Sequence, residues 1–229
     1  MNLAVSGQID DVKQWWDEHP MDYQGYDKKQ LETDDDYRAF FAKVDEAWYN
    51  STMQINSSNP AYLGDRLLDR NRVAGRKVLE IGCGMGTWTQ TFAEWGCDVT
   101  GIDLTGYAVE MTKKRLELAD LKARVIEMDA ANTGLPDDAF DFIWSWGVIH
   151  HSPHTEQIVK EIHRLLKPGG EFGIMVYYKY SVHSTYVLVR LGLLRGELFR
   201  YRWQDLQARH SEAEDYGAPL LRAPGQRGV

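Results

Sequence analysis

This chain of 229 residues has few cysteines and few prolines, and it has no long uninterrupted run of apolar residues. Its two cysteines, Cys83 and Cys97, are too few for a disulfide framework and fit a reducing compartment. No apolar run approaches the roughly 18–20 residues that a membrane-spanning helix needs, so we expect no integral membrane association. The first residues lack the basic and apolar segments of a signal peptide. We therefore expect a cytoplasmic protein.

Positive charge is also in short supply. The 34 acidic residues outnumber the 26 basic ones, which gives a formal net charge of -8. Such a balance provides no general attraction to nucleic acid, so we expect no nucleic-acid partner. Hydrophobic residues make up 43% of the chain and charged residues 26%, which is typical of a folded globular protein. At about 150 residues per domain, the length fits one large domain, alone or with an extension.

From residue 77 onward, short apolar segments alternate with longer amphipathic ones. The apolar segments predict strands over residues 77–81, 98–103, 123–128, 140–146 and 171–177. The segments between them predict helices over residues 85–95, 107–120 and 155–166. The last of these helices ends at a predicted turn, Lys167-Pro168-Gly169-Gly170. Strands and helices that alternate at this spacing predict an α/β fold with a parallel sheet covered on both faces.

The segments on either side of this region differ from it. Residues 1–74 predict a helical N-terminal cap, with helices over 9–19 and 37–53, and residues 179–229 predict a helical segment followed by a polar tail. The cap is rich in aromatic side chains, which include Trp15, Trp16, Tyr23, Tyr26 and Trp48. These side chains either close over a ligand site as a lid or only pack on the neighbouring domain. We favour the lid.

A glycine-rich loop follows the first predicted strand, with the sequence Glu80-Ile81-Gly82-Cys83-Gly84-Met85-Gly86. Glycine permits tight turns and lets a ligand lie directly against the backbone. Asp103 ends the second predicted strand, where a carboxylate can accept hydrogen bonds from both hydroxyls of a ribose. A dinucleotide site needs a glycine at position 87, where this chain has Thr87. A nicotinamide-dependent oxidoreductase therefore remains only as an alternative.

The loop contains an acid, one further residue and then G-x-G-x-G, and it resembles the first motif of the class I S-adenosylmethionine-dependent methyltransferases. Asp103 matches the second motif of that family, and Asp129-Ala130 matches the third. Further matches are Leu135-Pro136, Val148-Ile149-His150-His151 and Leu165-Leu166-Lys167-Pro168-Gly169-Gly170. The resemblance covers about residues 75–178 and implies a Rossmann-like, doubly wound, mostly parallel sheet as the core domain.

The resemblance also implies the cofactor, S-adenosylmethionine, and its product, S-adenosylhomocysteine. In the family, the residue matched by Asp103 holds the ribose, and the pair matched by Asp129 and Ala130 contacts the adenine. For Glu80, the resemblance implies a water-linked contact to the methionine part of the cofactor, which we favour over the alternative that this acid only caps the turn. The cofactor-binding residues implied in this way are Glu80, Gly82, Cys83, Gly84, Met85, Gly86, Asp103, Leu104, Asp129, Ala130 and Trp146.

Two histidines, His150 and His151, follow the fourth predicted strand and are the candidate catalytic residues. Histidine titrates near neutral pH and can act as a general base when the methyl acceptor must lose a proton. The alternative is that the pair only makes local hydrogen bonds. His154 lies nearby and would complete a metal cluster, but no carboxylate joins these residues, so we predict no metal.

We expect the acceptor to be a small molecule that is methylated at oxygen, nitrogen or carbon. DNA amino-group methyltransferases carry an N/D-P-P-aromatic motif after the fourth strand, where this chain has Trp144-Ser145-Trp146-Gly147. A protein or RNA methyltransferase and a non-catalytic cofactor-binding domain remain as alternatives. The family's final antiparallel hairpin is not evident in residues 203–229. An uncovered strand edge favours association, so we expect a homodimer.

Overall fold

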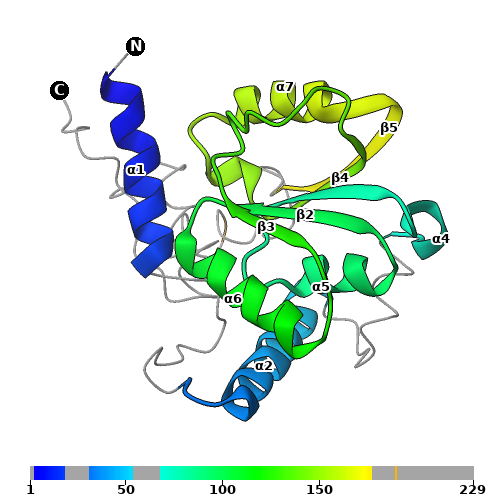
Figure 1. The fold of residues 1–229 in the computed structure, drawn as a ribbon. Helices are drawn as coiled ribbons and strands as arrows, with labels where there is room; N and C mark the ends of the chain where they lie inside the picture. Colours follow the sequence, from blue (N-terminus) through cyan, green and yellow to red (C-terminus); the bar gives the residue numbers. More distant parts are fainter. Residues whose placement is uncertain (1–2, 19–30, 54–67, 177–188, 190–229) are drawn as a thin grey trace. The chain divides into compact units, whose positions relative to one another are not determined.

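Five parallel strands form one sheet in the order β3-β2-β1-β4-β5 (Figure 1). The computed structural model describes residues 3–18, 31–53, 68–176 and 189. The strands are β1 (Lys77–Ile81), β2 (Asp98–Asp103), β3 (Arg124–Glu127), β4 (Phe140–Trp146) and β5 (Leu166–Met175). The strand order reverses beside β1, between β2 and β4. Open α/β sheets bind their ligands at such a reversal, outside the carboxyl ends of the strands.

Helices cover both faces of this sheet, as the alternating pattern predicts. They are α1 (Leu3–Glu18), α2 (Asp34–Met53), α4 (Arg70–Val73), α5 (Thr87–Glu94), α6 (Gly106–Leu118), the 3-10 turn η2 (Ile149–His151) and α7 (Thr155–Leu165). On one face, Trp88 and Phe92 of α5 pack against Val78 and Val99 of the sheet. On the other face, α7 packs against the opposite side chains of the same strands. The chain is therefore a three-layer α/β fold over the core strands.

The amphipathic face of α7 shows how the sequence directs this packing. Ile158, Ile162 and Leu165 recur at helical spacing, and all three are buried. They share a hydrophobic cluster with Leu79 of β1 and Ile143 of β4, each of which is fully buried. Burial of one such side chain stabilises the fold by about 1.5–3 kcal/mol. The helix is thereby fixed against the face formed by β1 and β4.

The predicted bounds of β1, β2 and β4 are confirmed, whereas the predicted start of β5 is wrong. Phe140 pairs with Leu166 and Phe142 pairs with Glu171, so the register shifts between the two pairs. The predicted turn at residues 167–170 is accommodated within β5 as this irregularity, where Gly169 has a φ of +78°. β5 therefore pairs with β4 both before and after the segment that the sequence predicts to be a turn. At the other end of the chain, α1 begins at Leu3, six positions before the predicted start.

Several predictions fall on parts of the chain that the structure does not describe. They concern Tyr23, Tyr26, the side chain of Trp48, and residues 177–229 apart from position 189. The chain divides into two compact units, Met1–Val176 and Tyr177–Val229, and all the elements named above lie in the first. Among the described helices, none has the length and apolar character needed to cross a membrane.

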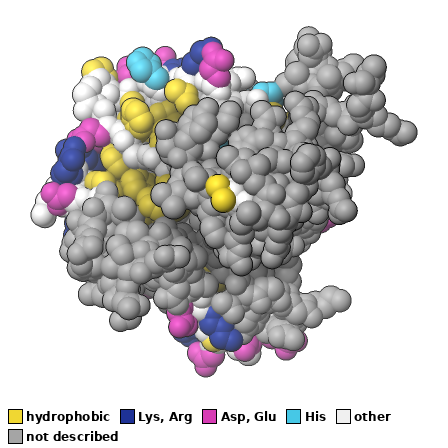
Figure 2. All heavy atoms as spheres, turned by 180° about the vertical axis from the view of Figure 1, so that it is seen from behind, with side chains coloured by type: hydrophobic (Ala, Val, Ile, Leu, Met, Phe, Trp, Pro, Cys, Tyr) yellow, Lys and Arg dark blue, Asp and Glu magenta, His cyan; other side chains and the backbone are white. Residues whose placement is uncertain are grey.

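An edge of the sheet carries exposed apolar side chains. β5 is the last strand in the order, and Phe172 on it is 59% exposed. Val176, directly after the strand, is 47% exposed, and Val159 on α7 is 49% exposed. Figure 2 shows hydrophobic side chains gathered on the described part of the face opposite to that of Figure 1. The homodimer remains a prediction.

Candidate active site

The glycine loop joins β1 to α5 at the carboxyl edge of the sheet. Gly82, Gly84 and Gly86 have φ angles of +79°, +51° and +81°, in the left-handed region that favours glycine. The amides of Gly82 and Cys83 donate to the carbonyl of Ile102 at 2.8 and 3.0 Å, which holds the loop against β2. Gly86 immediately precedes α5 and offers no capping side chain. The first-turn amides of this helix can therefore bind an anionic group.

The three glycines differ in the space around them. A Cβ at Gly82 would lie 2.2 Å from Val148 Cγ2, and one at Gly86 would lie 3.1 Å from Thr112. By contrast, a Cβ at Gly84 would meet nothing within 4 Å. The loop is thus packed against protein at its ends and open in its middle. This arrangement fits a cofactor that lies directly on the backbone at Gly84.

Asp103 lies at the end of β2 beside this open glycine. Its Oδ2 accepts from the Gly84 amide at 3.0 Å, and its Oδ1 accepts from both the amide and the hydroxyl of Thr105 at 3.0 Å. Burial raises the pKa of this carboxyl, and these hydrogen bonds partly offset that rise. A carboxylate can accept about four hydrogen bonds, so three partners leave capacity at Oδ2 for a ribose hydroxyl.

The ends of β2 and β3 meet beside Asp103. The Met128 amide donates to the Asp103 carbonyl at 2.7 Å, which carries Asp129 and Ala130 to this edge of the sheet. Asp129 Oδ1 accepts from the Ala131 amide at 2.9 Å, so that side chain is held in a local turn. The structure therefore brings the predicted ribose and adenine residues together at adjacent strand ends.

Glu80 lies beneath the loop and is only 4% exposed. Burial raises its pKa to about 8, although the Thr89 hydroxyl of α5 donates to its Oε2 and opposes the rise. The carboxyl is therefore mostly protonated at neutral pH. Cys83 is also buried, and burial raises the pKa of its thiol, so it does not resemble an activated nucleophile.

Two other predicted cofactor residues have side chains that pack in or against the hydrophobic core. The side chain of Met85 is buried in a cluster with Phe41 of α2 and Met111 of α6. Only the backbone of Met85 is therefore left to contact a cofactor. Trp146 is half-buried, and its ring stacks on that of Trp144 with centroids 5.6 Å apart. Their roles in cofactor binding stay predictions.

The histidine pair occupies η2, directly after β4. The rings of His150 and His151 lie 4.1 Å apart, and the ring of His151 meets Trp16 of α1 edge-on at 5.3 Å. Burial lowers the pKa of His150 to about 4 and that of His151 to about 3, and His150 further lowers the value for His151. Both rings are therefore neutral at pH 7 and can accept a proton, though only as weak bases.

Helix α1 contacts the site at two places, beside the ends of β2 and β3 and beside the histidine pair. The individual residues that make these contacts were not predicted from the sequence. Lys13 donates to the Leu104 carbonyl at 2.9 Å and forms an ion pair with Glu127 of β3. Trp16, three positions later, contacts the histidine side. Residues three apart share a helix face, so this spacing was the one available signal.

Within the described part of the chain, no three histidine, cysteine, aspartate or glutamate side chains are arranged to hold a metal ion.

Comparisons with known proteins show which family this chain is similar to. A family model described as "Methyltransferase domain" matches residues 78–170. Ubiquinone biosynthesis O-methyltransferase from Actinobacillus pleuropneumoniae serotype 7 (strain AP76) is 30% identical over 163 residues, which are 66% of this chain and 68% of that protein. Phosphoethanolamine N-methyltransferase 2 from Caenorhabditis elegans is 35% identical over 129 residues, which are 53% of this chain and 30% of that protein.

A solved structure shares the fold. It comes from Galdieria sulphuraria and is described as a candidate sarcosine dimethylglycine methyltransferase. It superposes with a TM-score of 0.50 at 19% identity, over 82% of this chain and 67% of that one. The chain spans about a third of the length of the first curated relatives that it matches, namely 34%, 30% and 30%.

Proposed function

Because this chain belongs to the class I S-adenosylmethionine-dependent methyltransferases, we propose that it transfers a methyl group from S-adenosylmethionine to a small-molecule acceptor. The observation that carries this proposal is the open backbone at Gly84 beside the Asp103 carboxylate. Two relatives are named as ubiquinone biosynthesis and phosphoethanolamine methyltransferases, and these names support a small acceptor. The acidic net charge of -8 argues against RNA.

The proposed binding roles are those that the family resemblance implies, and the contacts already described support them. Asp103 accepts from the ribose, Asp129 and Ala130 bind the adenine, and the first-turn amides of α5 receive the carboxylate. Bound S-adenosylmethionine supplies a methyl group on a positively charged sulfur. The protein's part is to hold an acceptor atom in line with that group, and such positioning can lower a barrier by several kcal/mol.

Helix α1 is proposed as the lid of this site. Lys13 joins it to the carboxyl ends of β2 and β3, while Trp16 joins it to His151. A helix held at both places would exclude water from the acceptor. We propose a cytoplasmic location, which the free thiols of Cys83 and Cys97 support. We also propose self-association through the exposed edge at β5.

Thermal unfolding with S-adenosylmethionine, S-adenosylhomocysteine and NAD tests the cofactor first. A ligand at 100 times its dissociation constant adds about 2.7 kcal/mol of stability, so the midpoint is expected to rise by roughly 5–10 °C with both sulfur ligands. Transfer of a labelled methyl group to a panel of phenols, amines and carbon acids then tests the activity. A shift with NAD alone would support an oxidoreductase. Binding without transfer to any acceptor would support a non-catalytic domain, and label on RNA or protein would replace the small acceptor.

Substitution of the histidines tests proton transfer. His150→Gln and His151→Gln are expected to lower kcat by about 100-fold or more for at least one of the two, if the acceptor must lose a proton. Because the pKa values are about 4 and 3, the base form persists well below pH 6.5, and kcat should stay flat from pH 7 down to about pH 5. The exposed His163 on α7 provides the control, His163→Gln. Equal losses for an acceptor without a transferable proton would assign the pair a structural role.

A further inference from the structure

Arg115 of α6 lies behind the glycine loop and is only 5% exposed. Its Nη2 pairs with Asp45 Oδ2 of α2 at 2.5 Å, and its Nε donates to Gln90 Oε1 of α5 at 2.6 Å. Its Nη1 donates to the Thr87 hydroxyl at 3.2 Å and to the Met85 carbonyl at 3.4 Å. One buried guanidinium thus joins α2, the loop and the start of α5.

Thr112 supports the same loop one turn earlier on α6. Its hydroxyl donates to the Gly84 carbonyl at 2.9 Å. Because a trans peptide is planar, a carbonyl held toward α6 turns the following amide, that of Met85, to the opposite side. A Cβ at Gly86 would lie 3.1 Å from Thr112 and 3.2 Å from Arg115 Cδ, so no side chain separates the loop from α6. α6 therefore determines which way the loop presents its backbone.

Asp45 supplies the counter-charge for this buried cation from a helix 70 positions away in the sequence. Its other oxygen, Oδ1, accepts from the Thr87 hydroxyl at 2.9 Å. Asp45 therefore holds both Arg115 and the first residue of α5. A buried charge that loses its partner is strongly unfavourable, so Arg115 would be expected to move without Asp45.

We propose that Asp45 and Arg115 are positioning residues for the cofactor loop, and that docking of α2 through Asp45 holds this loop in the geometry that binds S-adenosylmethionine. The inference rests on the proposed function. It gives the N-terminal helical region a second role: α1 covers the site, and α2 supports the loop from behind.

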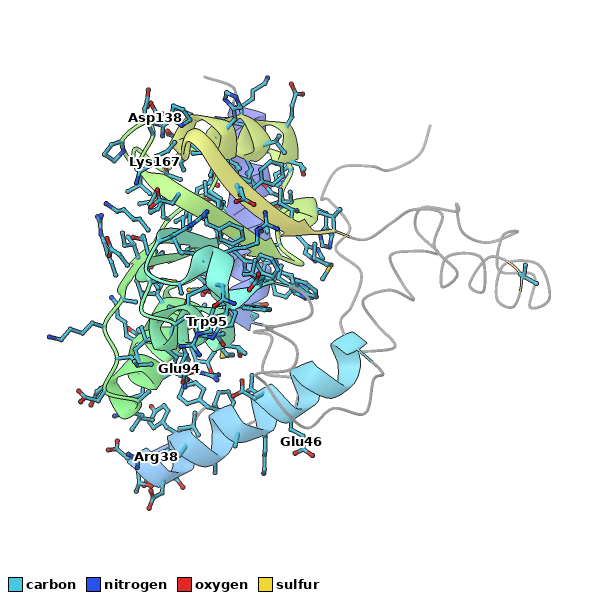
Figure 3. All side chains as sticks on the ribbon, turned by 90° about the vertical axis from the view of Figure 1, so that its right-hand side faces the viewer. Arg38, Glu46, Glu94, Trp95, Asp138 and Lys167 are labelled. Carbon is cyan, nitrogen blue, oxygen red and sulfur yellow. The ribbon has the colours of Figure 1, made fainter. Side chains whose placement is uncertain are left out.

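A second ion pair between the same two helices provides a matched control. Asp34, the first residue of α2, pairs with Lys114 of α6 at 2.8 Å, whereas Asp45 lies near the middle of the helix. The side chain of Asp34 is 58% exposed, compared with 26% for that of Asp45. Glu46 is an exposed acid next to Asp45, and Figure 3 shows it on the side of α2 that faces away from the sheet.

The test measures the affinity of the full chain for S-adenosylhomocysteine by calorimetry, together with urea unfolding without ligand. Asp45→Asn is expected to weaken binding about tenfold, the size of effect typical for residues that act through a coupled network. Asp34→Asn and Glu46→Gln should change the dissociation constant by less than about twofold. Asp45→Glu should restore part of the affinity. Arg115→Lys should weaken binding as Asp45→Asn does, because lysine lacks the planar fork.

Each outcome decides the proposal. If Asp45→Asn lowers stability but the folded protein binds with wild-type affinity, Asp45 is only structural and the proposal fails. It also fails if Asp34→Asn weakens binding equally, since any loosening of α2 would then suffice. If Asp45→Asn does not fold, Thr87→Val decides: it removes the hydroxyl that contacts both Asp45 and Arg115, keeps the ion pair between those two residues and should weaken binding. A wild-type chain that does not bind S-adenosylhomocysteine would overturn the cofactor assignment and this proposal with it.

Discussion

Replacement of Asp103 by asparagine is expected to weaken the binding of S-adenosylhomocysteine by at least about 100-fold. Oδ1 of the new side chain can still accept from Thr105, but an amide group would replace Oδ2 and would face the Gly84 amide, donor against donor. The change also removes the charge-assisted hydrogen bond that we propose Asp103 makes to the ribose, and a bond of this kind contributes about 1.5–3 kcal/mol. About 2.7 kcal/mol corresponds to the 100-fold loss. Calorimetric titration measures this directly.

Asp98 provides the control for this experiment, because it begins the same strand that Asp103 ends. Asp98→Asn also removes one carboxylate, but at the amino end of β2, away from the proposed site, and it should leave the affinity for S-adenosylhomocysteine unchanged. Asp103→Ala should weaken binding at least as much as Asp103→Asn. If Asp103→Asn binds as tightly as the wild type, the ribose does not lie at Asp103, and the arrangement at the carboxyl edge must be reassigned.

The parts of this fold that could be predicted from the sequence are those set by local pattern. β1, β2 and β4 have the predicted bounds because each has a mainly buried, largely apolar centre, and because Gly82 follows β1, Gly147 follows β4 and Asp103 ends β2. The strands are buried on both faces, so a continuous apolar run is the expected signal. The positive φ angles at Gly82, Gly84 and Gly86 likewise follow from a turn between strand and helix.

The parts that could not be predicted depend on pairs of residues far apart in the chain. Arg115 shares a helix face with Met111 and reads as an ordinary amphipathic position, yet it is buried against Asp45. No periodicity within α2 or α6 marks that pair. The irregularity in β5 was missed for a related reason. Lys167 to Gly170 carry a strong turn signal, and pairing between β4 and β5 on both sides of it overrides that signal.

The histidines illustrate a third limit, which concerns strength rather than position. Their place after β4 could be predicted from the motif order. Their protonation could not, because the pKa of a histidine depends on burial that only the folded chain supplies. The sequence suggests bases with pKa values near 7, whereas burial keeps His150 and His151 uncharged down to about pH 5. A proton acceptor here would thus work by proximity more than by basicity.

Replacement of Glu80 by glutamine is expected to stabilise the ligand-free protein at alkaline pH. Burial raises the pKa of Glu80 from 4.5 to about 8. A carboxyl with a raised pKa in the folded state favours folding fully below pH 4.5, and that contribution is lost as pH rises through 8. Compared with its value below pH 4.5, the unfolding free energy of the wild type should therefore be lower by about 3 kcal/mol at pH 7 and by about 5 kcal/mol above pH 9, because of this group. Glu80→Gln resembles the protonated form and avoids this loss.

Urea unfolding at pH 5, 7 and 9 measures the difference between the two proteins, which should widen steadily with pH. Glu94→Gln, on the exposed side of α5, controls for the loss of one acidic side chain (Figure 3). A constant difference across this range would mean that Glu80 is ionised in the folded state and that Thr89 and its surroundings stabilise the charge.

The carboxyl of Glu80 also couples cofactor binding to the release of a proton. If the cofactor's ammonium group approaches it, binding at pH 7 should release a proton from the wild type but not from Glu80→Gln, because a nearby cation lowers the pKa of a buried acid.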